Sequence, residues 1–517
     1  MSQNKPSKNM MPTYPEPFWR DSVPFDQYDP LDKDIEADVV IVGGGITGIT
    51  TGYLLQQEGM NVVILEASQI LNGTTAHTTA KITAQHNIIY NEFMNHFGKE
   101  KARDYYEANM QAKAFIQDLI EKHDIDCDFK EQDAVIYATS NQSRMDLETE
   151  WDAYEKLGID SEFLEDIPLP IDHVKGALVM KNQAQFHPLK YLKHLVDDFI
   201  KRGGKIYEKT TAVDVQEEAR PKVITKPGYK AAAQYVISAS HFPFYDFKGA
   251  YYSRMYASRS YVIGVKTREK FPGGMYLSAD EPTRSLRTAT YKGEEIVIVA
   301  GENHKTGHDT DTIKHYEALQ DFANQKLGIK EFLYRWSAQD LTTLDKVPYI
   351  GRITANEPSI LIATGFRKWG MTTSTVAAQL VTDIILRKDN PFEELYSPSR
   401  FKADPGLRRF VSQNLDVAGH FIKGKVGMKS KSTEDLENGE GAVVKIDGER
   451  AGAYKDENGK LYVVNTTCTH MGCELEWNSG EHTWDCPCHG SRFSIEGDII
   501  EGPAERPLSQ IDVDDGA

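Results

Sequence analysis

The sequence is poor in cysteine: its 517 residues contain only five, and four of these lie between positions 468 and 488. So few cysteines exclude a disulfide framework as the basis of the fold, and their clustering indicates special chemistry in one segment. The chain also lacks an uncharged apolar run of about 18 residues, which a membrane-spanning helix requires. No apolar segment follows the lysines of the N-terminus, as a secretory signal requires, so we expect a cytoplasmic protein.

Basic residues are in deficit, with 59 Lys and Arg against 77 Asp and Glu, a net charge of −18. Because nucleic-acid binding requires a basic surface, this balance argues against nucleic acid as the main partner. Residues 432–517 contain 19 acidic and 6 basic residues, a net charge of −13, so this segment is a separate unit by composition. The basic stretch before it, GHFIKGKVGMKSK (419–431), fits a linker or an exposed loop.

Residues 38–66 have the pattern of a strand, a glycine-rich turn, a helix and a second strand: DVVIVGGGITGITTGYLLQQEGMNVVILE. The apolar runs Val39–Val42 and Val62–Leu65 are typical of buried parallel strands, and the helical pattern between them reaches about Gln57. This segment is therefore a complete βαβ unit.

The glycines of this unit have the spacing of a dinucleotide-binding turn. Gly43 allows the tight turn, Gly45 lets the backbone approach a pyrophosphate at the helix N-terminus, and Gly48 lets the helix pack closely on the strand. Glu66, at the end of the second strand, can accept a hydrogen bond from a ribose hydroxyl. The unit predicts dinucleotide binding.

Four later segments indicate which dinucleotide is bound. They are LNGTTAHTTAKITAQH (71–86), FHPLKYLKHLVDDFIKRGGKIYEKTTAVDV (186–215), LDKVPYIGRI (344–353) and LIATGFRKWGMTTSTVAAQLVTDIIL (361–386). In this order, and over roughly residues 35–395, the chain resembles the FAD-dependent oxidoreductases of the D-amino-acid oxidase, glycine oxidase and sarcosine dehydrogenase superfamily. The resemblance implies FAD as the cofactor. It also implies that six residues lie along the flavin or near the adenine: Thr74, Thr75, His77, Val213, Gly365 and Gly370.

The resemblance also implies a fold: a Rossmann-type α/β domain for FAD and a substrate domain built on an antiparallel sheet. The FAD-binding domain would comprise residues 35–85, 186–244 and 341–395, and the substrate domain residues 86–185 and 245–340. Residues 1–34 would form an N-terminal extension, residues 396–431 a linker and residues 432–517 a further domain. Within the substrate domain, the amphipathic stretch at 99–123 predicts a helix that faces the core.

Members of this superfamily remove a hydride from a carbon that bears nitrogen or sometimes oxygen, and often hold a substrate carboxylate with an arginine. Arg367 is the candidate for that role, and a structural pairing with an acid is the alternative. No general base is evident, and a neutral amine needs none. His77 matches a histidine that is covalently bonded to flavin in sarcosine and dimethylglycine dehydrogenases. The residues after His77 depart from that pattern, which favours a non-covalent contact.

Near the C-terminus, CTHMGC (468–473) and CPCHGS (486–491) have the spacing of metal ligands. Two Cys and two His would also satisfy zinc, so the spacing leaves zinc open. The surrounding residues resemble the Rieske iron–sulfur proteins of respiratory and photosynthetic cytochrome complexes, where two Cys hold one iron and two His the other. The resemblance implies a small all-β domain with a 2Fe-2S cluster held by Cys468, His470, Cys486 and His489.

The same resemblance assigns the neighbouring residues. Cys473 and Cys488 would form a disulfide, Ser491 would donate its hydroxyl to a cluster sulfur, and EGPAERPL (501–508) would be a third loop. Phe493 stands where the high-potential proteins have a tyrosine, so a hydrogen bond that raises the potential is missing. We expect a potential below the top of the Rieske range of roughly −150 to +300 mV. The retained cysteine pair argues against the lowest-potential, oxygenase-ferredoxin type.

These features together indicate an FAD-dependent dehydrogenase that oxidises a small amine or amino-acid-like substrate. Its electrons would leave through the Rieske cluster to a one-electron acceptor protein, and the acidity of residues 432–517 favours a basic acceptor, although acidity for solubility alone is an alternative. One rival is a reductive flavoenzyme or monooxygenase that receives electrons through the cluster. Another is a non-catalytic redox sensor.

Overall fold

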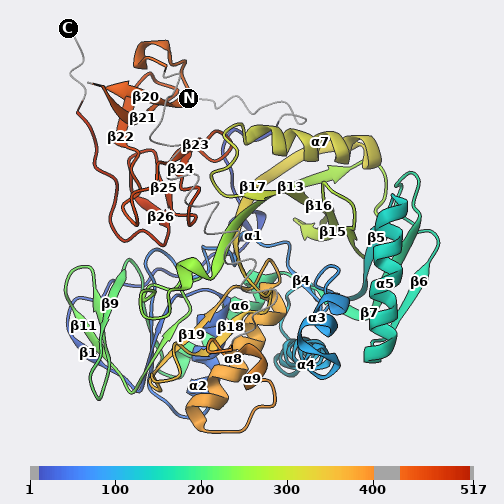
Figure 1. Ribbon diagram of the computed structural model, residues 1–517, viewed down its shortest axis with the longest axis horizontal. Coiled ribbons are helices and arrows are strands. Elements are labelled where there is room, and N and C mark those ends of the chain that lie inside the picture. The colour runs from blue at the N-terminus through green and yellow to red at the C-terminus, as the bar shows by residue number, and fades with distance from the viewer. Residues whose placement is uncertain (1–10, 401–430, 447, 513–517) are drawn as a thin grey trace.

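The computed structural model describes residues 11–400, 431–446 and 448–512. We call residues 11–400 the N-terminal part and the remaining described residues the C-terminal domain. The N-terminal part contains a parallel sheet with helices, a large antiparallel sheet and a small four-stranded sheet, and the C-terminal domain lies against the large sheet (Figure 1). No helix in these described ranges is long and apolar enough to cross a membrane.

The parallel sheet has six strands in the order β18-β19-β12-β2-β3-β8, and only the β18–β19 pair is antiparallel. Its strands are β2 (Val39–Val42), β3 (Val62–Leu65), β8 (Lys205–Tyr207), β12 (Tyr235–Ser238), β18 (Tyr349–Arg352) and β19 (Ile360–Thr364). Helix α2 (Ile46–Gln57) packs between α6 (Pro188–Lys201) and α8 (Gly370–Leu386). Because helices cover the sheet, β2 and β3 are fully buried, as their continuous apolar runs predict.

The large sheet has nine strands, all paired antiparallel except β14 with β5. Its order is β17 (Ile329–Thr343), β13 (Met255–Thr267), β16 (Glu294–Lys305), β15 (Arg284–Tyr291), β14 (Met275–Ser278), β5 (Lys130–Ala138), β7 (Gly176–Gln185) and β4 (Lys81–Ile82), with β6 (Ser161–Leu164) beside β7. Of the strands at its two ends, β17 begins inside the predicted substrate segment 245–340 and continues to Thr343, whereas β4 belongs to the segment 35–85 predicted for FAD.

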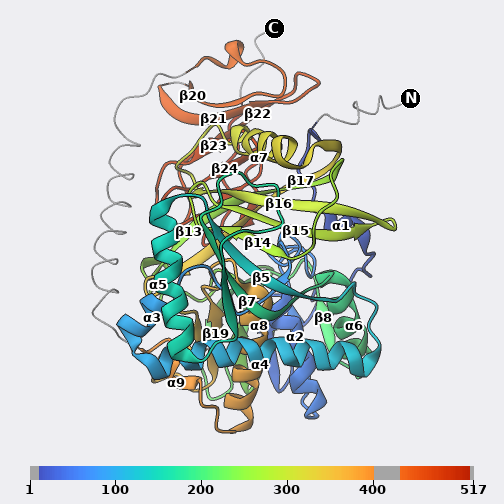
Figure 2. The same ribbon diagram turned by 90° about the vertical axis from the view of Figure 1, so that its right-hand side faces the viewer.

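Four helices lie in the connections between strands of the large sheet. They are α3 (Tyr90–Phe97), α4 (Lys99–His123), α5 (Asn141–Leu157) and α7 (Ile313–Leu327). The helix predicted at 99–123 is confirmed with these bounds as α4, which packs against α8 (Figure 2). Helix α7 lies along β13, β16 and β17 on the side of the C-terminal domain (Figure 1).

The small sheet has the order β1 (Ile35–Glu36), β11 (Lys230–Ala232), β10 (Lys222–Thr225) and β9 (Ala212–Gln216). The described part of the N-terminal extension is packed into the core through the short helix α1 (Phe18–Ser22). Phe18 and Trp19 are fully buried, and the indole of Trp19 donates a hydrogen bond to the carbonyl of Thr78 at 2.7 Å. The extension therefore supports the loop that the sequence assigns to the flavin.

The C-terminal domain consists of two antiparallel sheets. One contains β20 (Gly441–Ile446), β21 (Glu449–Lys455) and β22 (Leu461–Asn465); the other contains β23 (Glu476–Asn478), β24 (Thr483–Asp485), β25 (Arg492–Phe493) and β26 (Ile499–Glu501). An all-β C-terminal domain was expected, and the structure confirms it. Most of the predicted linker, residues 401–430, lies outside the described residues.

Hydrogen bonds between buried or partly buried groups hold the C-terminal domain against β17 and α7. Arg335 donates to the carbonyl of Gly480 at 2.7 Å, Thr312 to the side chain of Asn478 at 2.5 Å and Tyr316 to the carboxylate of Glu481 at 2.5 Å. Because these hydrogen bonds pair named groups of the two parts in fixed positions, the two parts form a specific interface.

Candidate functional site

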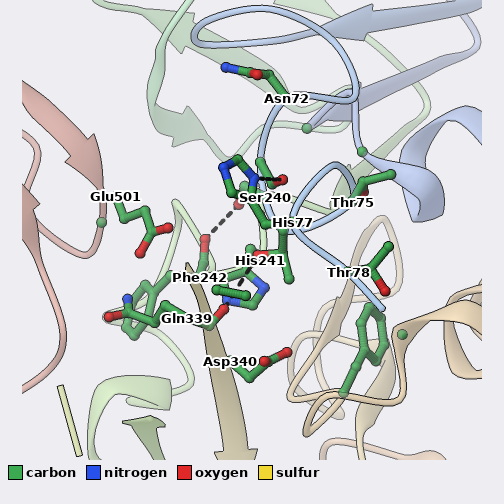
Figure 3. A pocket seen from close by; sticks show the side chains of 18 of the residues that line it. Asn72, Thr75, His77, Thr78, Ser240, His241, Phe242, Gln339, Asp340 and Glu501 are labelled. Atoms are coloured by element: carbon green, nitrogen blue, oxygen red, sulfur yellow. Dashed lines mark hydrogen bonds between the residues drawn. The ribbon is translucent and has the colours of Figure 1, made fainter. Parts of the chain in front are cut away.

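A cavity of about 1130 Å³ lies between the parallel sheet, the nine-stranded sheet and the C-terminal domain. Its volume exceeds the roughly 300–1,000 Å³ of typical small-molecule sites, so it has room for a large cofactor. Its walls contain nine residues that the sequence predicted for this site: Gly43, Gly45, Glu66, Thr74, Thr75, His77, Val213, Arg367 and Gly370. The fold thus brings residues from five separate segments to one space. Figure 3 shows two of them, Thr75 and His77, at this cavity.

The glycine turn after β2 has the geometry that a dinucleotide requires. Gly43 has a φ of +112°, and a Cβ there would lie 2.4 Å from the carbonyl oxygen of Ala239. The backbone N–H of Gly44 donates to the carboxylate of Glu66 at 2.8 Å, and Ser68 donates to the other carboxylate oxygen at 2.9 Å. Burial raises the pKa of Glu66. A carboxylate accepts about four hydrogen bonds, so Glu66 retains capacity for a ribose hydroxyl.

Two predicted glycines lie behind the cavity wall rather than in it. A Cβ on Gly48 would lie 1.9 Å from the carbonyl oxygen of Gly43, which fits the close packing of helix on strand that the sequence predicts. Gly365 was expected to bring its backbone close to the flavin, but it does not line the cavity. Its φ of +78° and a Cβ position 2.5 Å from Thr343 explain why glycine is required there.

The loop after β3 contributes Thr75 and His77. The hydroxyl of Thr75 accepts the N–H of Ile46, the first residue of α2, at 3.0 Å. His77 donates from Nδ1 to the carbonyl of Gly73 at 2.9 Å, and burial lowers the pKa of His77. The imidazole is therefore neutral at pH 7, with the lone pair on Nε2. Figure 3 shows His77 among the side chains that line the cavity.

The residues of this cavity fit FAD. Gly45 caps α2, whose N-terminus favours a negative group such as a pyrophosphate, and a Cβ there would lie 3.2 Å from the Thr75 hydroxyl. At the N-terminal end of α8, Ser374 lines the cavity, and its buried hydroxyl has no hydrogen-bond partner among the described residues. An orphaned polar atom of this kind fits a site that a polar cofactor completes.

Arg367 lines the cavity as the sequence predicts. It donates from Nη2 to the carbonyl of His86 at 2.9 Å, while its buried Nε has no hydrogen-bond partner in the described ranges. The ring of His86 stacks on Trp369, with centroids 4.8 Å apart. Arg367 is therefore held in place on one side and has a donor available on the other.

Several cavity residues were not predicted from the sequence. Lys81 and Lys368 line the wall, and burial lowers the pKa of Lys81 to about 7 and that of Lys368 to about 8. Burial raises the pKa of Asp340, whose carboxylate accepts the backbone N–H of Lys368 at 3.1 Å. Lys81 and Lys368 lie inside the segments that the sequence assigned to the flavin, and this position was the signal that could have indicated a place in the cavity. The sequence alone gives no sign that a lysine is buried.

The C-terminal domain also contributes to the cavity wall, through Glu481, Arg492 and the segment around Glu501. Glu501 points toward the same space as His77 and Gln339 (Figure 3). The guanidinium of Arg492 lies 3.4 Å from the carboxylate of Glu501 and 3.2 Å from that of Asp485. Its positive charge partly offsets the negative charge of these two groups. The sequence resemblance assigned residues 501–508 to a cluster loop and gave no indication of a contact with the cavity.

The four predicted cluster ligands lie together at the ends of two turns. Cys468 and Cys486 are buried free thiols that share a hydrogen bond, which lowers the pKa of Cys468 to about 7. The rings of His470 and His489 are 5.0 Å apart, and Nδ1 of each is buried with no partner in the described residues. Burial lowers the pKa of both histidines to about 4, so each is neutral and has a lone pair for a metal.

The other two cysteines of residues 468–488 form the predicted disulfide, Cys473–Cys488, with a Cα–Cα distance of 6.5 Å. The sulfur of Cys486 lies within 4.8 Å of both, but the disulfide removes them as ligands. Ser491 is fully buried beside the thiols, forms a hydrogen bond with Cys468 and accepts the N–H of Ala504 at 3.0 Å. Two thiols, two neutral imidazoles and a hydroxyl at the sulfur are a donor set that fits a Rieske cluster.

Comparisons with known proteins agree with both sites. Residues 38–384 match the family model for FAD dependent oxidoreductases, and residues 428–512 match that for the Rieske [2Fe-2S] domain. The chain is 51% identical over 500 residues to YhfW of Bacillus subtilis, described as a Rieske 2Fe-2S iron–sulfur protein, and this match covers 97% of this chain and 98% of that one.

More distant matches cover the N-terminal part. The chain is 24% identical over 375 residues to the gamma-glutamylputrescine oxidoreductase of Escherichia coli, covering 69% of this chain and 85% of that one. The glycine oxidase of Geobacillus kaustophilus has a similar fold, with a TM-score of 0.61 and 19% identity over 71% of this chain and 99% of that one. The chain belongs to the FAD-dependent oxidoreductase family and carries a C-terminal Rieske domain, so its cofactors are FAD and a 2Fe-2S cluster.

Proposed function

We propose that the protein is a dehydrogenase for a small amine or amino-acid-like substrate, with the Rieske domain as the exit for its electrons to a one-electron acceptor. The observation that carries this proposal is that residues of the Rieske domain form part of the wall of the FAD cavity. The similar proteins named for glycine and gamma-glutamylputrescine support a substrate with an amino group.

When bound, FAD supplies a two-electron acceptor for a hydride and the Rieske cluster supplies a one-electron carrier. In the proposed reaction the substrate loses a hydride from the carbon that bears nitrogen, so its carbon–nitrogen single bond becomes a double bond. The two electrons reduce two equivalents of an external one-electron acceptor, and the hydrogen nucleus is released to solvent as a proton.

Arg367 would bind the carboxylate of an amino-acid-like substrate. Its Nε is buried in the cavity wall without a partner in the described residues, and the hydrogen bond to His86 orients the guanidinium. The Arg367→Met variant should raise the KM for carboxylate-bearing substrates about ten- to hundredfold and leave amines without a carboxylate unchanged. An equal effect on both classes would mean that Arg367 has a structural role.

An anaerobic screen of amines, amino acids and hydroxy acids tests the reaction. A substrate should bleach the flavin absorbance in the absence of oxygen. If no amine or amino acid bleaches the flavin, the dehydrogenase proposal is wrong. If hydroxy acids also fail to bleach the flavin, the redox-sensor alternative is favoured.

The Cys486→Ser variant tests the direction of electron flow, because it should remove the cluster. Bleaching by substrate and transfer to a small dye should remain, while transfer to a protein acceptor should collapse. If this variant reduces the protein acceptor as fast as the parent, electrons do not leave through the cluster. A reductive role, with electrons entering there, then becomes the better explanation.

The acidity of residues 432–517, with a net charge of −13, supports a basic acceptor. Steered association slows when salt is added, because the Debye length falls from about 10 Å at 0.1 M to about 3 Å at 1 M. The rate with a basic protein acceptor should therefore fall with salt, and the rate with a neutral dye should not. A salt-independent protein reaction would assign the acidity to solubility alone.

A further inference from the structure

Gln339, on strand β17, contacts the turn that carries a predicted cluster ligand. Its side-chain Nε2 donates a hydrogen bond to the carbonyl of Gly490 at 2.8 Å, and Gly490 directly follows His489. Only 2% of the Gln339 residue is exposed, so the bond is shielded from bulk water and its loss leaves a buried carbonyl without this partner.

The same residue contacts the loop that is predicted to pass the flavin. The backbone carbonyl of Gln339 accepts a hydrogen bond from the hydroxyl of Thr74 at 3.4 Å. Thr306 donates to the side-chain oxygen of Gln339 at 2.7 Å, which fixes the amide with its nitrogen toward Gly490. Gln339 thus connects the flavin loop on one side with the cluster turn on the other, and it also lines the cavity (Figure 3).

Two glycines allow the two parts to pack closely at this point. A Cβ on Gly490 would lie 2.5 Å from the Cβ of Ala257, and a Cβ on Gly307 would lie 2.6 Å from the nitrogen of Pro487. Distances below about 3 Å are not tolerated by real side chains, so both positions require glycine. The ligand turn therefore packs directly against the N-terminal part, on the side chains of Ala257 and Gln339 at Gly490 and on the backbone of Gly307 at Pro487.

The charged contacts nearby are looser. Arg259 is fully buried at the interface, but its Nε lies 3.8 Å from Asp485 and its Nη2 lies 3.7 Å from Glu501. These distances exceed those of hydrogen bonds, and the Nε has no hydrogen-bond partner among the described residues. The hydrogen bond from Gln339 to Gly490 is therefore the tighter link to the ligand turn.

We propose that Gln339 is a positioning residue for electron transfer: it holds the ligand turn of His489 against the flavin loop and provides the contact through which single electrons cross between the two sites. The proposal rests on the proposed function. Each oxidised substrate molecule requires two successive single-electron crossings, with two equivalents of the external one-electron acceptor taking the electrons. No proton needs to cross this contact.

The Gln339→Met variant tests the contact, because methionine has nearly the same length and no hydrogen-bond donor. In the holoenzyme, a light pulse in the presence of EDTA reduces the flavin without any substrate. The signal of the reduced cluster then appears at the rate at which electrons cross from the flavin to the cluster, the crossing rate. We expect this rate to fall by about two- to tenfold, the range that loss of one buried hydrogen bond predicts. The midpoint potentials of flavin and cluster, and the electron paramagnetic resonance spectrum of the cluster, should stay unchanged.

A second variant tests the docking without replacing a residue of the cavity wall or a predicted cluster ligand. Gly307→Ala places a methyl group against Pro487, whereas Gly293→Ala has a similar positive φ, +79° against +73°, and no atom within 4 Å of the added Cβ. Hydrogen–deuterium exchange of residues 486–491 should rise, and the crossing rate should fall, only in Gly307→Ala. The shared backbone strain makes Gly293→Ala a matched control.

The outcomes separate this inference from the function on which it rests. If the parent shows crossing and Gln339→Met crosses equally fast, Gln339 is not the contact. If Gln339→Met shifts a midpoint potential or the cluster spectrum, its effect is structural and the inference is also wrong. If the parent itself shows no crossing, the proposed electron exit fails together with the inference.

Discussion

The ring of Tyr252 stands perpendicular to the ring of His489, with centroids 5.6 Å apart and an angle of 89°. It meets His470 in a similar way, at 5.9 Å and 73°. Tyr252 belongs to the N-terminal part and both histidines to the Rieske domain, so a side chain of one part covers the predicted histidine ligands of the other. The histidine edge of the centre therefore faces the interface between the two parts.

This contact predicts that Tyr252 stabilises the ligand loop. Edge-to-face aromatic pairs contribute about 0.5–1.5 kcal/mol beyond the area they bury. In Tyr252→Ala, hydrogen–deuterium exchange of residues 468–473 should increase about two- to tenfold, while Tyr252→Phe, which keeps the ring, should match the parent. If the exchange of residues 468–473 is unchanged in Tyr252→Ala, the aromatic contacts do not stabilise the ligand loop.

The ligand assignment predicts about two iron atoms and two acid-labile sulfides per chain. Cys468→Ser and His489→Ala should each lose the iron and keep the flavin, because the two sites use separate residues. Cys127→Ala is the matched control: Cys127 is a buried thiol outside residues 468–491, so this variant should retain full iron. Stoichiometric zinc in protein produced with iron available would contradict the assignment.

We expect the flavin to be bound without a covalent bond to His77. Acid precipitation should leave the yellow fluorescence in the supernatant, because the residues after His77 differ from those of the covalent enzymes. The neutral imidazole, with Nδ1 donating to Gly73, nevertheless leaves Nε2 as a nitrogen that could form such a bond. Fluorescence that stays with the precipitate of the parent, and is lost in His77→Ala, would overturn this expectation.

Lys81 predicts a specific pH dependence of stability. Its Nζ donates to the carbonyl of Tyr276 at 2.8 Å and to the hydroxyl of Ser285 at 2.7 Å, and burial lowers its pKa to about 7. A lysine in the unfolded chain has a pKa of about 10.4, so between these values the unfolded state binds one more proton than the folded state. The free energy of unfolding must therefore rise with pH across this window.

The Lys81→Met variant should lose this component. Its free energy of unfolding, measured in urea from pH 7 to pH 10, should rise less steeply than that of the parent. Lys330→Met, at an exposed position of β17, should keep the slope of the parent. Equal slopes in all three proteins would mean that Lys81 keeps its proton when the protein folds.

Local patterns in the sequence were sufficient for the elements that depend on neighbouring residues. The runs Val39–Val42 and Val62–Leu65 are β2 and β3 with the predicted bounds, and the stretch at 99–123 is α4. The resemblance of residues 468–491 to Rieske proteins also implied the disulfide Cys473–Cys488, which the structure contains. Apolar periodicity, glycine turns and ligand spacing are set within a few residues, so the sequence alone determines them.

The contacts between the two parts required the tertiary structure. Gln339 lies in an ordinary strand sequence, and only the docking of a turn far along the chain brings the carbonyl of Gly490 within reach of its amide nitrogen. Likewise, Glu501 carries no sign in the sequence that it reaches the FAD cavity, and Lys81 none that it is buried. Burial, pKa shifts and contacts between domains depend on which distant surfaces meet, and that is decided by the packing of the whole chain rather than by neighbours in sequence.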